Sequence, residues 1–353
     1  MAELLDYLKE AVGRNAADLF IVAGGVVSAK IDGQIQPLLD DERLLPPRTQ
    51  ALIEDIYGQA KRSMDHYLEN GDDDFSFAVP GLARFRVNAY RQRGSMAAVI
   101  RVVAFDIPNW ENMRVPPQVM ELANVTHGMI LVTGTAGSGK STTQACIIDR
   151  INRTRNCHII TLEDPIEFLH RNRNSLVSQR EIAIDTENYL SALRACLRQA
   201  PDVILLGEMR DHETIRTAMT AAETGHLLIA TLHTKGAANT IDRIIDTFSP
   251  DQQAQIRLQL CTVLHTVVSQ QLIPDVNGGL VPAFEVMHMN SAIRSMIRDN
   301  KNHQIDNVIT AGGKEGMISM DQSILNLYQN GFITKETALN YSDNPEQLRR
   351  RLT

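Results

Sequence analysis

One segment of the sequence combines residue types and a spacing that suit the binding of phosphate groups. Residues 134–141 follow the pattern G-x-x-x-x-G-K-[ST]. Glycines allow successive backbone N–H groups to turn toward phosphate oxygens without a clash from Cβ atoms, and the start of a following helix adds partial positive charge. The pattern and the residue after it predict nucleotide contacts at Gly134, Thr135, Ala136, Gly137, Ser138, Gly139, Lys140, Ser141 and Thr142.

Two residues of this segment carry specific chemistry. Lys140 would bring a full positive charge to the β- and γ-phosphates of a nucleoside triphosphate, and Ser141 would offer its hydroxyl to Mg²⁺. A glycine-rich turn that binds nothing is the plain alternative. The apolar run 129–133 and the helical pattern 141–152 flank the segment as strand and helix. This context is the one that the motif requires, so it favours a phosphate-binding loop.

Carboxylates follow two further predicted strands. Glu163 comes after the apolar run 158–162, and Glu208 after 203–206, where glycine replaces the usual Mg²⁺-binding aspartate. Ligands of open α/β sheets lie beyond the carboxyl ends of the strands. We therefore expect Glu208 to orient or deprotonate an attacking water, with Glu163 assisting, and both to reach the metal through water. Glu163 could instead cap a helix, and we interpret Glu167 as structural.

Two histidines flank the predicted strand 227–231. His233 follows this strand, where a group that senses the γ-phosphate belongs, and His226 precedes it. A single histidine is more often an ordinary core or surface residue, and only its position favours a role for His233. We assign His233 to catalysis and His226 to nucleotide binding.

Arginines are concentrated in the last two strands predicted for the first hundred residues, at positions 84, 86, 91, 93 and 101. Arg84 and Arg86 share one face of a strand because side chains alternate with period two. Composition favours a solvated charged face. The second interpretation is that arginines of this cluster reach a nucleotide at a domain or subunit boundary and neutralise transition-state charge.

The elements that would position these residues fall into successive regions. Residues 1–107 show short alternating strands with two helical patterns, which predicts an α+β domain with an antiparallel sheet. Prolines mark an interdomain linker at 108–117. Within 118–290, short apolar strands alternate with helices, which predicts a parallel sheet covered on both faces. Residues 291–353 are predicted to be helical.

Composition excludes several classes of protein. The 353 residues include 43% apolar and 22% charged residues, as in ordinary globular proteins. The net charge of −7 and the 5% aromatic content argue against a nucleic-acid-binding surface. The four cysteines lack C-x-x-C spacing, which argues against a tetracysteine zinc site. No apolar run approaches the ~20 residues of a membrane span, so we expect a cytoplasmic protein without direct membrane insertion.

Taken together, these motifs resemble the bacterial secretion ATPases of type II secretion and type IV pilus systems over almost the whole chain. The resemblance rests on the phosphate-binding loop, on ITLEDPIEF at 160–168, on GEMRD at 207–211 and on the histidine-containing segment 226–243. It implies a PAS-like N-terminal domain, a RecA-like P-loop NTPase core, hydrolysis of ATP with Mg²⁺ and a homohexameric ring. It also raises the arginine-finger interpretation of Arg84 and Arg101 above that of a solvated face.

One further segment indicates a branch of this family. Residues 292–299, AIRSMIRD, resemble the AIRNLIRE segment of the pilus-retraction members. The resemblance implies retraction of type IV pili in twitching motility, an inner-membrane platform protein as partner, a paralogous motor ATPase as a second partner, and a peripheral position at the cytoplasmic face of the membrane. The alternatives are a pilus-assembly or type II secretion ATPase, an accessory retraction motor, a nucleic-acid-translocating motor, and a regulatory protein that only holds ATP.

Overall fold

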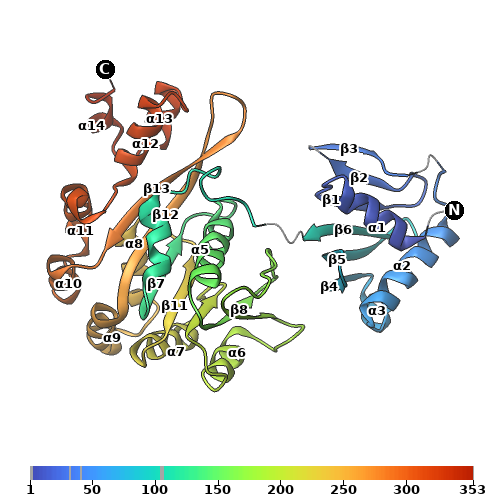
Figure 1. Ribbon diagram of the computed structural model, residues 1–353, viewed down its shortest axis with the longest axis horizontal. Coiled ribbons are helices and arrows are strands. Elements are labelled where there is room, and N and C mark those ends of the chain that lie inside the picture. The colour runs from blue at the N-terminus through green and yellow to red at the C-terminus, as the bar shows by residue number, and fades with distance from the viewer. Residues whose placement is uncertain (1–2, 32, 40–41, 104–106, 353) are drawn as a thin grey trace. The chain divides into compact units, whose positions relative to one another are not determined.

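The chain forms two compact units, residues 1–106 and 107–353. They are seen in a computed structural model that describes residues 3–31, 33–39, 42–103 and 107–352 (Figure 1). Each unit has its own hydrophobic core and is described by itself.

The first unit is an antiparallel sheet covered by helices. Its strands pair in the order β3-β2-β1-β6-β5-β4, and every neighbouring pair is antiparallel. The strands are β1 (Asp18–Ile21), β2 (Ser28–Ile31), β3 (Gln34–Pro37), β4 (Asp72–Val79), β5 (Ala83–Gln92) and β6 (Ser95–Val103). The helices are α1 (Leu4–Gly13), α2 (Pro46–Ala60) and α3 (Asp65–Asn70).

Alternating side chains on β5 explain how this sheet is covered. Phe85 and Val87 are fully buried and belong to the same core as Leu52 and Ile56 of α2. Arg84 lies between the buried positions on β5, on the other face of the sheet. Arg84 and Arg86 therefore lie on the face that α2 does not cover.

The second unit contains a seven-stranded sheet with the order β13-β12-β7-β11-β10-β8-β9. All neighbouring pairs are parallel except β12 with β13. The strands are β7 (Gly128–Thr133), β8 (His158–Glu163), β9 (Leu176–Glu181), β10 (Val203–Leu206), β11 (Leu227–Leu232), β12 (Leu264–Pro274) and β13 (Leu280–His288). The predicted parallel α/β core is confirmed.

Helices cover both faces of this sheet, which explains why β7 is buried at every position. Met129 and Leu131 belong to one core, and Ile130 and Val132 to another. Elements outside the sheet are α4 (Pro117–Met120), η1 (Glu121–Asn124), α5 (Lys140–Thr154), α6 (Tyr189–Cys196), α7 (His212–Glu223), α8 (Ala237–Asp246), α9 (Pro250–Val263), α10 (Ser291–Arg298), η2 (Asn302–Gln304), α11 (Ile305–Ala311), η3 (Gly312–Glu315), α12 (Met320–Gln329), α13 (Lys335–Tyr341) and α14 (Pro345–Arg349).

Residues 108–115 of the predicted linker 108–117, together with Ile107, pack within the second unit. Ile107 and Trp110, the single tryptophan of the sequence, lie against the core that contains Val115 and the inner face of α5. Cys146 on α5 donates its Sγ–H to the carbonyl oxygen of Pro108 at 3.4 Å. This segment forms one wall beside the start of α5.

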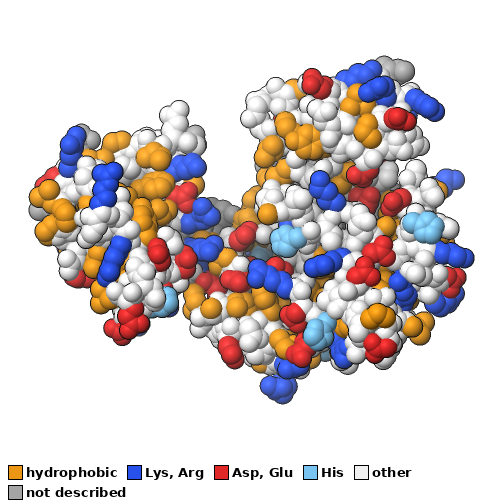
Figure 2. Space-filling view, turned by 180° about the vertical axis from the view of Figure 1, so that it is seen from behind, with side chains coloured by type: hydrophobic (Ala, Val, Ile, Leu, Met, Phe, Trp, Pro, Cys, Tyr) orange, Lys and Arg blue, Asp and Glu red, His pale blue; other side chains and the backbone are white. Residues whose placement is uncertain are grey.

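The surface carries charges of both signs. On the face shown in Figure 2, lysine and arginine side chains are interspersed with aspartate and glutamate. Among the described residues, no helix has the length and apolar character to cross a bilayer.

Candidate nucleotide-binding site

The loop between β7 and α5 has the backbone conformation that phosphate binding needs. Gly134, Gly137 and Gly139 have φ values of +142°, +75° and +86°, which glycine adopts without strain. A Cβ atom at Gly134 would lie 2.2 Å from the carbonyl oxygen of Gln270. No side chain caps the N-terminus of α5. Its first N–H groups, which have no partner within the helix, are therefore available to bind an anion.

Lys140 lies within this loop. Its Nζ donates to the carbonyl oxygens of Gly134 and Thr135 at 2.9 and 2.8 Å. Burial lowers the pKa of this ammonium, while the negative charges of Glu167 and Glu208 oppose the shift. The positive charge is therefore held at the mouth of the loop, facing two carboxylates.

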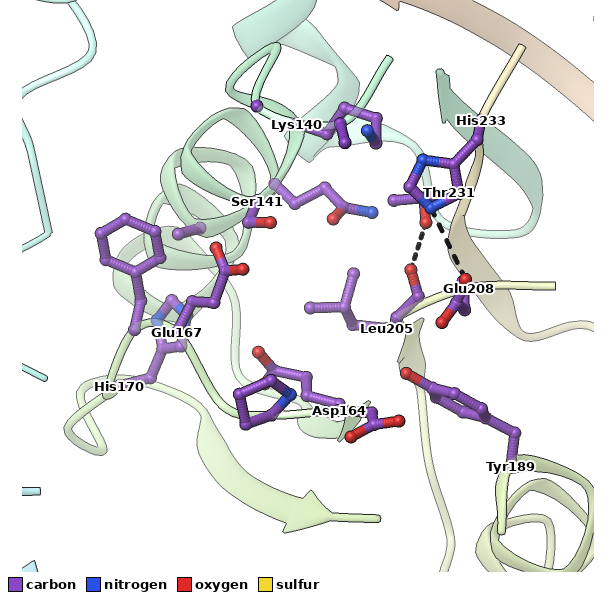
Figure 3. A pocket seen from close by; sticks show the side chains of 18 residues that line it. Lys140, Ser141, Asp164, Glu167, His170, Tyr189, Leu205, Glu208, Thr231 and His233 are labelled. Atoms are coloured by element: carbon purple, nitrogen blue, oxygen red, sulfur yellow. Dashed lines mark hydrogen bonds and ion pairs between the residues drawn. The ribbon is translucent and has the colours of Figure 1, made fainter. Parts of the chain in front are cut away.

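A cavity of about 250 Å³ opens beside the loop (Figure 3). It brings together seven residues that the sequence singles out for binding or catalysis: Ala136, Gly137, Lys140, Ser141, Glu163, Glu208 and His233. Of the other predicted contacts, Gly134, Thr135, Ser138 and Gly139 form the rest of the loop and do not line this cavity.

Glu208 and His233 meet because they follow neighbouring parallel strands, β10 and β11. His233 Nε2 lies 3.5 Å from Glu208 Oε2, and Arg210 pairs with the other oxygen of the same carboxylate. Glu208 is nearly buried, whereas half of the His233 side chain is exposed. The arrangement holds one carboxylate at the carboxyl edge of the sheet with a cation and an imidazole beside it.

Glu163 has a different environment at the end of β8. Its Oε1 accepts a hydrogen bond from Gln179 Nε2 at 3.2 Å, and burial raises the pKa of its carboxyl to about 7. A carboxyl group with this pKa is partly protonated at neutral pH, so it can exchange a proton as well as hold a water.

Glu167 is interpreted as structural from the sequence, but the cavity includes this residue. The structure places its side chain in the cavity, pointing toward Ser141 (Figure 3). Among the charges that act on Lys140, Glu167 has the largest effect. The segment 163–167 holds three carboxylates, and spacing along a loop does not reveal which of them turns inward.

His226 does not lie in this cavity, contrary to the prediction. In the parallel pairing of β11 with β7, Leu227 lies opposite Gly128, and Leu232 lies opposite Thr133. His226 therefore lies at the edge of the sheet opposite to the phosphate-binding loop. There its Nδ1 is 2.9 Å from the carbonyl oxygen of Ala221.

Thr142 lines a second cavity, of about 220 Å³, against the first turn of α5. Its wall includes the apolar side chains of Met113, Leu272 and Leu280. Arg114 also contributes; its guanidinium lies 3.8 Å from the ring centre of Phe332 and pairs with Asp275 at 3.2 Å. An apolar cavity at this place suits the uncharged part of a nucleotide.

The two predicted arginine fingers belong to the first unit. Arg84 lies on β5, and Arg101 on β6 donates from Nε to Asp18 Oδ1 at 2.9 Å. The cavities belong to the second unit. The role of these arginines stays a prediction.

Comparisons with known proteins agree on one family. The family model described as type II/IV secretion system protein matches residues 2–278. The type IV pilus retraction ATPase PilT of Pseudomonas aeruginosa is 42% identical over 98% of this chain and 99% of its own. The type IV pilus ATPase PilU of the same organism is 36% identical over 97% and 89%.

A solved structure of the pilus retraction motor PilT with bound ADP superposes with a TM-score of 0.90 at 44% identity, covering 99% of this chain and 100% of that one. This match confirms the predicted fold class, a PAS-like α+β domain followed by a RecA-like core and C-terminal helices. The chain therefore belongs to the type II/IV secretion system protein family.

Proposed function

We propose that this protein is an ATPase that powers the retraction of type IV pili. The observation that carries the proposal is the cavity in which Lys140, held inside the phosphate-binding loop, faces the carboxylates of Glu167 and Glu208. The full-length similarity to a relative named as a pilus retraction ATPase supports the biological role.

ATP would bind across the two cavities. The triphosphate would lie on the loop, where the N–H groups of α5 and the ammonium of Lys140 neutralise its charge. The adenine and ribose would lie in the cavity lined by Thr142, Leu272 and Leu280, because its apolar wall removes their surface from water.

The donor set fits Mg²⁺, which favours oxygen ligands and retains several waters. Ser141 would hold the ion directly, and Glu163 and Glu208 would hold it through water. When bound, Mg²⁺ supplies positive charge that neutralises the phosphate oxygens.

The chain's own residues would perform the rest of the chemistry. Glu208 orients the attacking water, and Glu167 is the second carboxylate that can accept its proton. Lys140 stabilises the negative charge that spreads over the transferred phosphoryl group. His233 lies next to Glu208, where it can respond to the γ-phosphate.

The proposed assembly is a homohexamer that acts on an inner-membrane platform protein at the cytoplasmic face, with a paralogous motor ATPase as a further partner. The net charge of −7 argues against nucleic acid among its partners. A role as accessory motor is the second candidate, and the higher identity to the retraction ATPase favours the first.

The experiment that tests the proposal is a count of surface pili after deletion of the gene. Complementation would use the wild type and Lys140→Ala, each checked for equal expression. We expect many pili and no twitching in the deletion strain, with rescue by the wild type alone. Cells without pili would identify an assembly motor instead, and rescue by Lys140→Ala would exclude a function powered by this loop.

A further inference from the structure

Strand β12 carries two neighbouring buried polar residues, Ser269 and Gln270, directly beside the phosphate-binding loop. Ser269 pairs with Thr133, the last residue of β7 before the loop begins. Both side chains are almost completely buried, with 2% and 4% of their surface exposed. Successive side chains of a strand point to opposite faces, so this pair contacts two different parts of the second unit.

Gln270 contacts the phosphate-binding loop. Its Oε1 accepts a hydrogen bond from Thr143 Oγ1 on α5 at 2.7 Å. A Cβ atom at Gly139 would lie 2.8 Å from Gln270 Nε2, and one at Gly134 would lie 2.2 Å from its carbonyl oxygen. Gln270 therefore packs against the first and last glycines of the loop and against the first turn of α5.

Ser269 contacts the loop that follows His233. Its Oγ accepts a hydrogen bond from the N–H of Gly236 at 3.0 Å. Glu285, which pairs with Ser269 across β12 and β13, accepts from the next N–H, that of Ala237, at 2.7 Å. Two successive N–H groups at the start of α8 are thus anchored to one cross-strand pair, and this fixes the end of the segment that carries His233.

We propose that Ser269 and Gln270 are positioning residues, and that each one holds a different half of the ATPase site in place. Gln270 holds the phosphate-binding loop in its binding conformation, and Ser269 holds the segment of His233 next to Glu208. This inference rests on the proposed ATP hydrolysis.

The two residues should therefore affect different kinetic constants. A loosened phosphate-binding loop weakens the binding of ATP in the ground and transition states alike, which raises KM with little change in kcat. A displaced His233 segment affects an interaction that matters only during the reaction, which lowers kcat with little change in ATP affinity. A merely structural role would lower the melting temperature, and unfolded protein would lower the apparent kcat in proportion to its fraction without changing KM. For each variant kcat is therefore calculated per folded molecule, at a temperature well below its melting temperature.

The test uses the full-length protein with four variants: Gln270→Leu, Gln270→Asn, Ser269→Ala and the double variant Gln270→Leu with Ser269→Ala. Gln270→Asn retains the amide but is one methylene too short to reach Thr143, so it serves if the leucine variant folds poorly. Gln271→Leu is the matched control, because the side chain of Gln271 contacts the carbonyl oxygen of Tyr341 instead of the loop. Affinity for a fluorescent ATP analogue, steady-state kcat and KM, and the melting temperature are measured for each.

We expect both Gln270 variants to raise Kd and KM about 10-fold with kcat within about threefold. Ser269→Ala should lower kcat about 5- to 10-fold with Kd unchanged, and the double variant should combine both effects. A loss of affinity in Ser269→Ala, a selective loss of kcat in the Gln270 variants, or equal effects in Gln271→Leu would overturn the inference. A wild type that neither binds nor hydrolyses ATP would instead refute the proposed function itself.

Discussion

Glu208 is held beside His233 by the ends of two parallel strands, and its role as the residue that orients water can be tested by removing only its charge. Glu208→Gln retains the size of the side chain and loses the negative charge that attracts the water proton. We expect kcat to fall about 100-fold or more, with the affinity for ATP within about threefold of the wild type. Phosphate release and the binding of a fluorescent ATP analogue measure the two quantities.

Glu213→Gln is the control for this change, because Glu213 is exposed on α7 and lies outside the cavity. Glu167→Gln tests the second carboxylate in the same assays. Full turnover of Glu208→Gln would remove Glu208 from its proposed role, and a large loss in Glu167→Gln would then assign the water to Glu167.

The glycines of the phosphate-binding loop differ in the atoms that an added side chain would contact. At Gly134 a methyl group would collide with the backbone of Gln270, which cannot move aside within a paired strand. At Gly137 the space is open, so only the positive φ opposes an L-residue. Gly134→Ala should therefore lower the stability of the folded protein and abolish ATP binding, whereas Gly137→Ala should cost about 1 kcal/mol. Thermal unfolding and ATP titration of both variants would show this order, and equal effects would contradict it.

At the level of secondary structure elements, the strand pair β12–β13 contains a buried carboxyl group. Burial raises the pKa of Glu285 to about 7. Between about pH 4.5 and 7 the Glu285 carboxyl is ionised in the unfolded chain but still mostly protonated in the folded protein. The folded protein therefore binds more protons than the unfolded chain, and its stability falls as the pH rises through this range. Glu285→Gln keeps an oxygen that can accept from Ala237 N and cannot ionise.

We therefore expect the variant to gain stability relative to the wild type as the pH is raised from about 5 to about 8, by up to about 3 kcal/mol. Urea unfolding at both pH values measures the difference. The other titrating groups contribute equally to both proteins, so their effect cancels in the difference between the two free energies of unfolding. If this difference is independent of pH, Glu285 does not titrate in this range.

A variant in helix α10 can test whether ATP hydrolysis is separable from pilus retraction. Ile293 and Ile297 anchor the helix in the core, whereas the side chain of Arg294 is partly exposed. Arg294→Ala should leave ATP hydrolysis within about twofold of the wild type, since this arginine does not line the cavity. We expect twitching to be reduced. Lys301→Ala is the control, and a parallel collapse of the ATPase activity would make this helix part of the enzyme's fold.

At the scale of the whole molecule, the arginines and the cavities belong to different compact units. If Arg101 acts as an arginine finger, Arg101→Ala should lower kcat about 10-fold or more without a change in ATP affinity. The same change removes the ion pair with Asp18, so Asp18→Asn separates the two effects. Normal kcat in Arg101→Ala would leave only the ion pair as its role.

Much of this organisation can be predicted from the sequence. The loop pattern identifies Lys140, and the ends of buried strands identify Glu208 and His233, because parallel strands bring their carboxyl ends to one edge. The same rule, applied strictly, would have excluded His226, which precedes its strand. The orientation of Glu167 within a loop has no periodicity that could reveal it. Gln270 is 127 residues from Thr143, and only the strand order brings them together.

Trp110 gives this chain a built-in optical reporter. It is the single tryptophan, it is half-buried against the core of the second unit, and its carbonyl oxygen accepts the N–H of Val115, which lines the proposed nucleoside cavity. Excitation of indole fluorescence therefore reports on one place in the molecule. A change in the wavelength or intensity of this emission on addition of ATP would report the occupancy of that cavity in real time, without an attached dye.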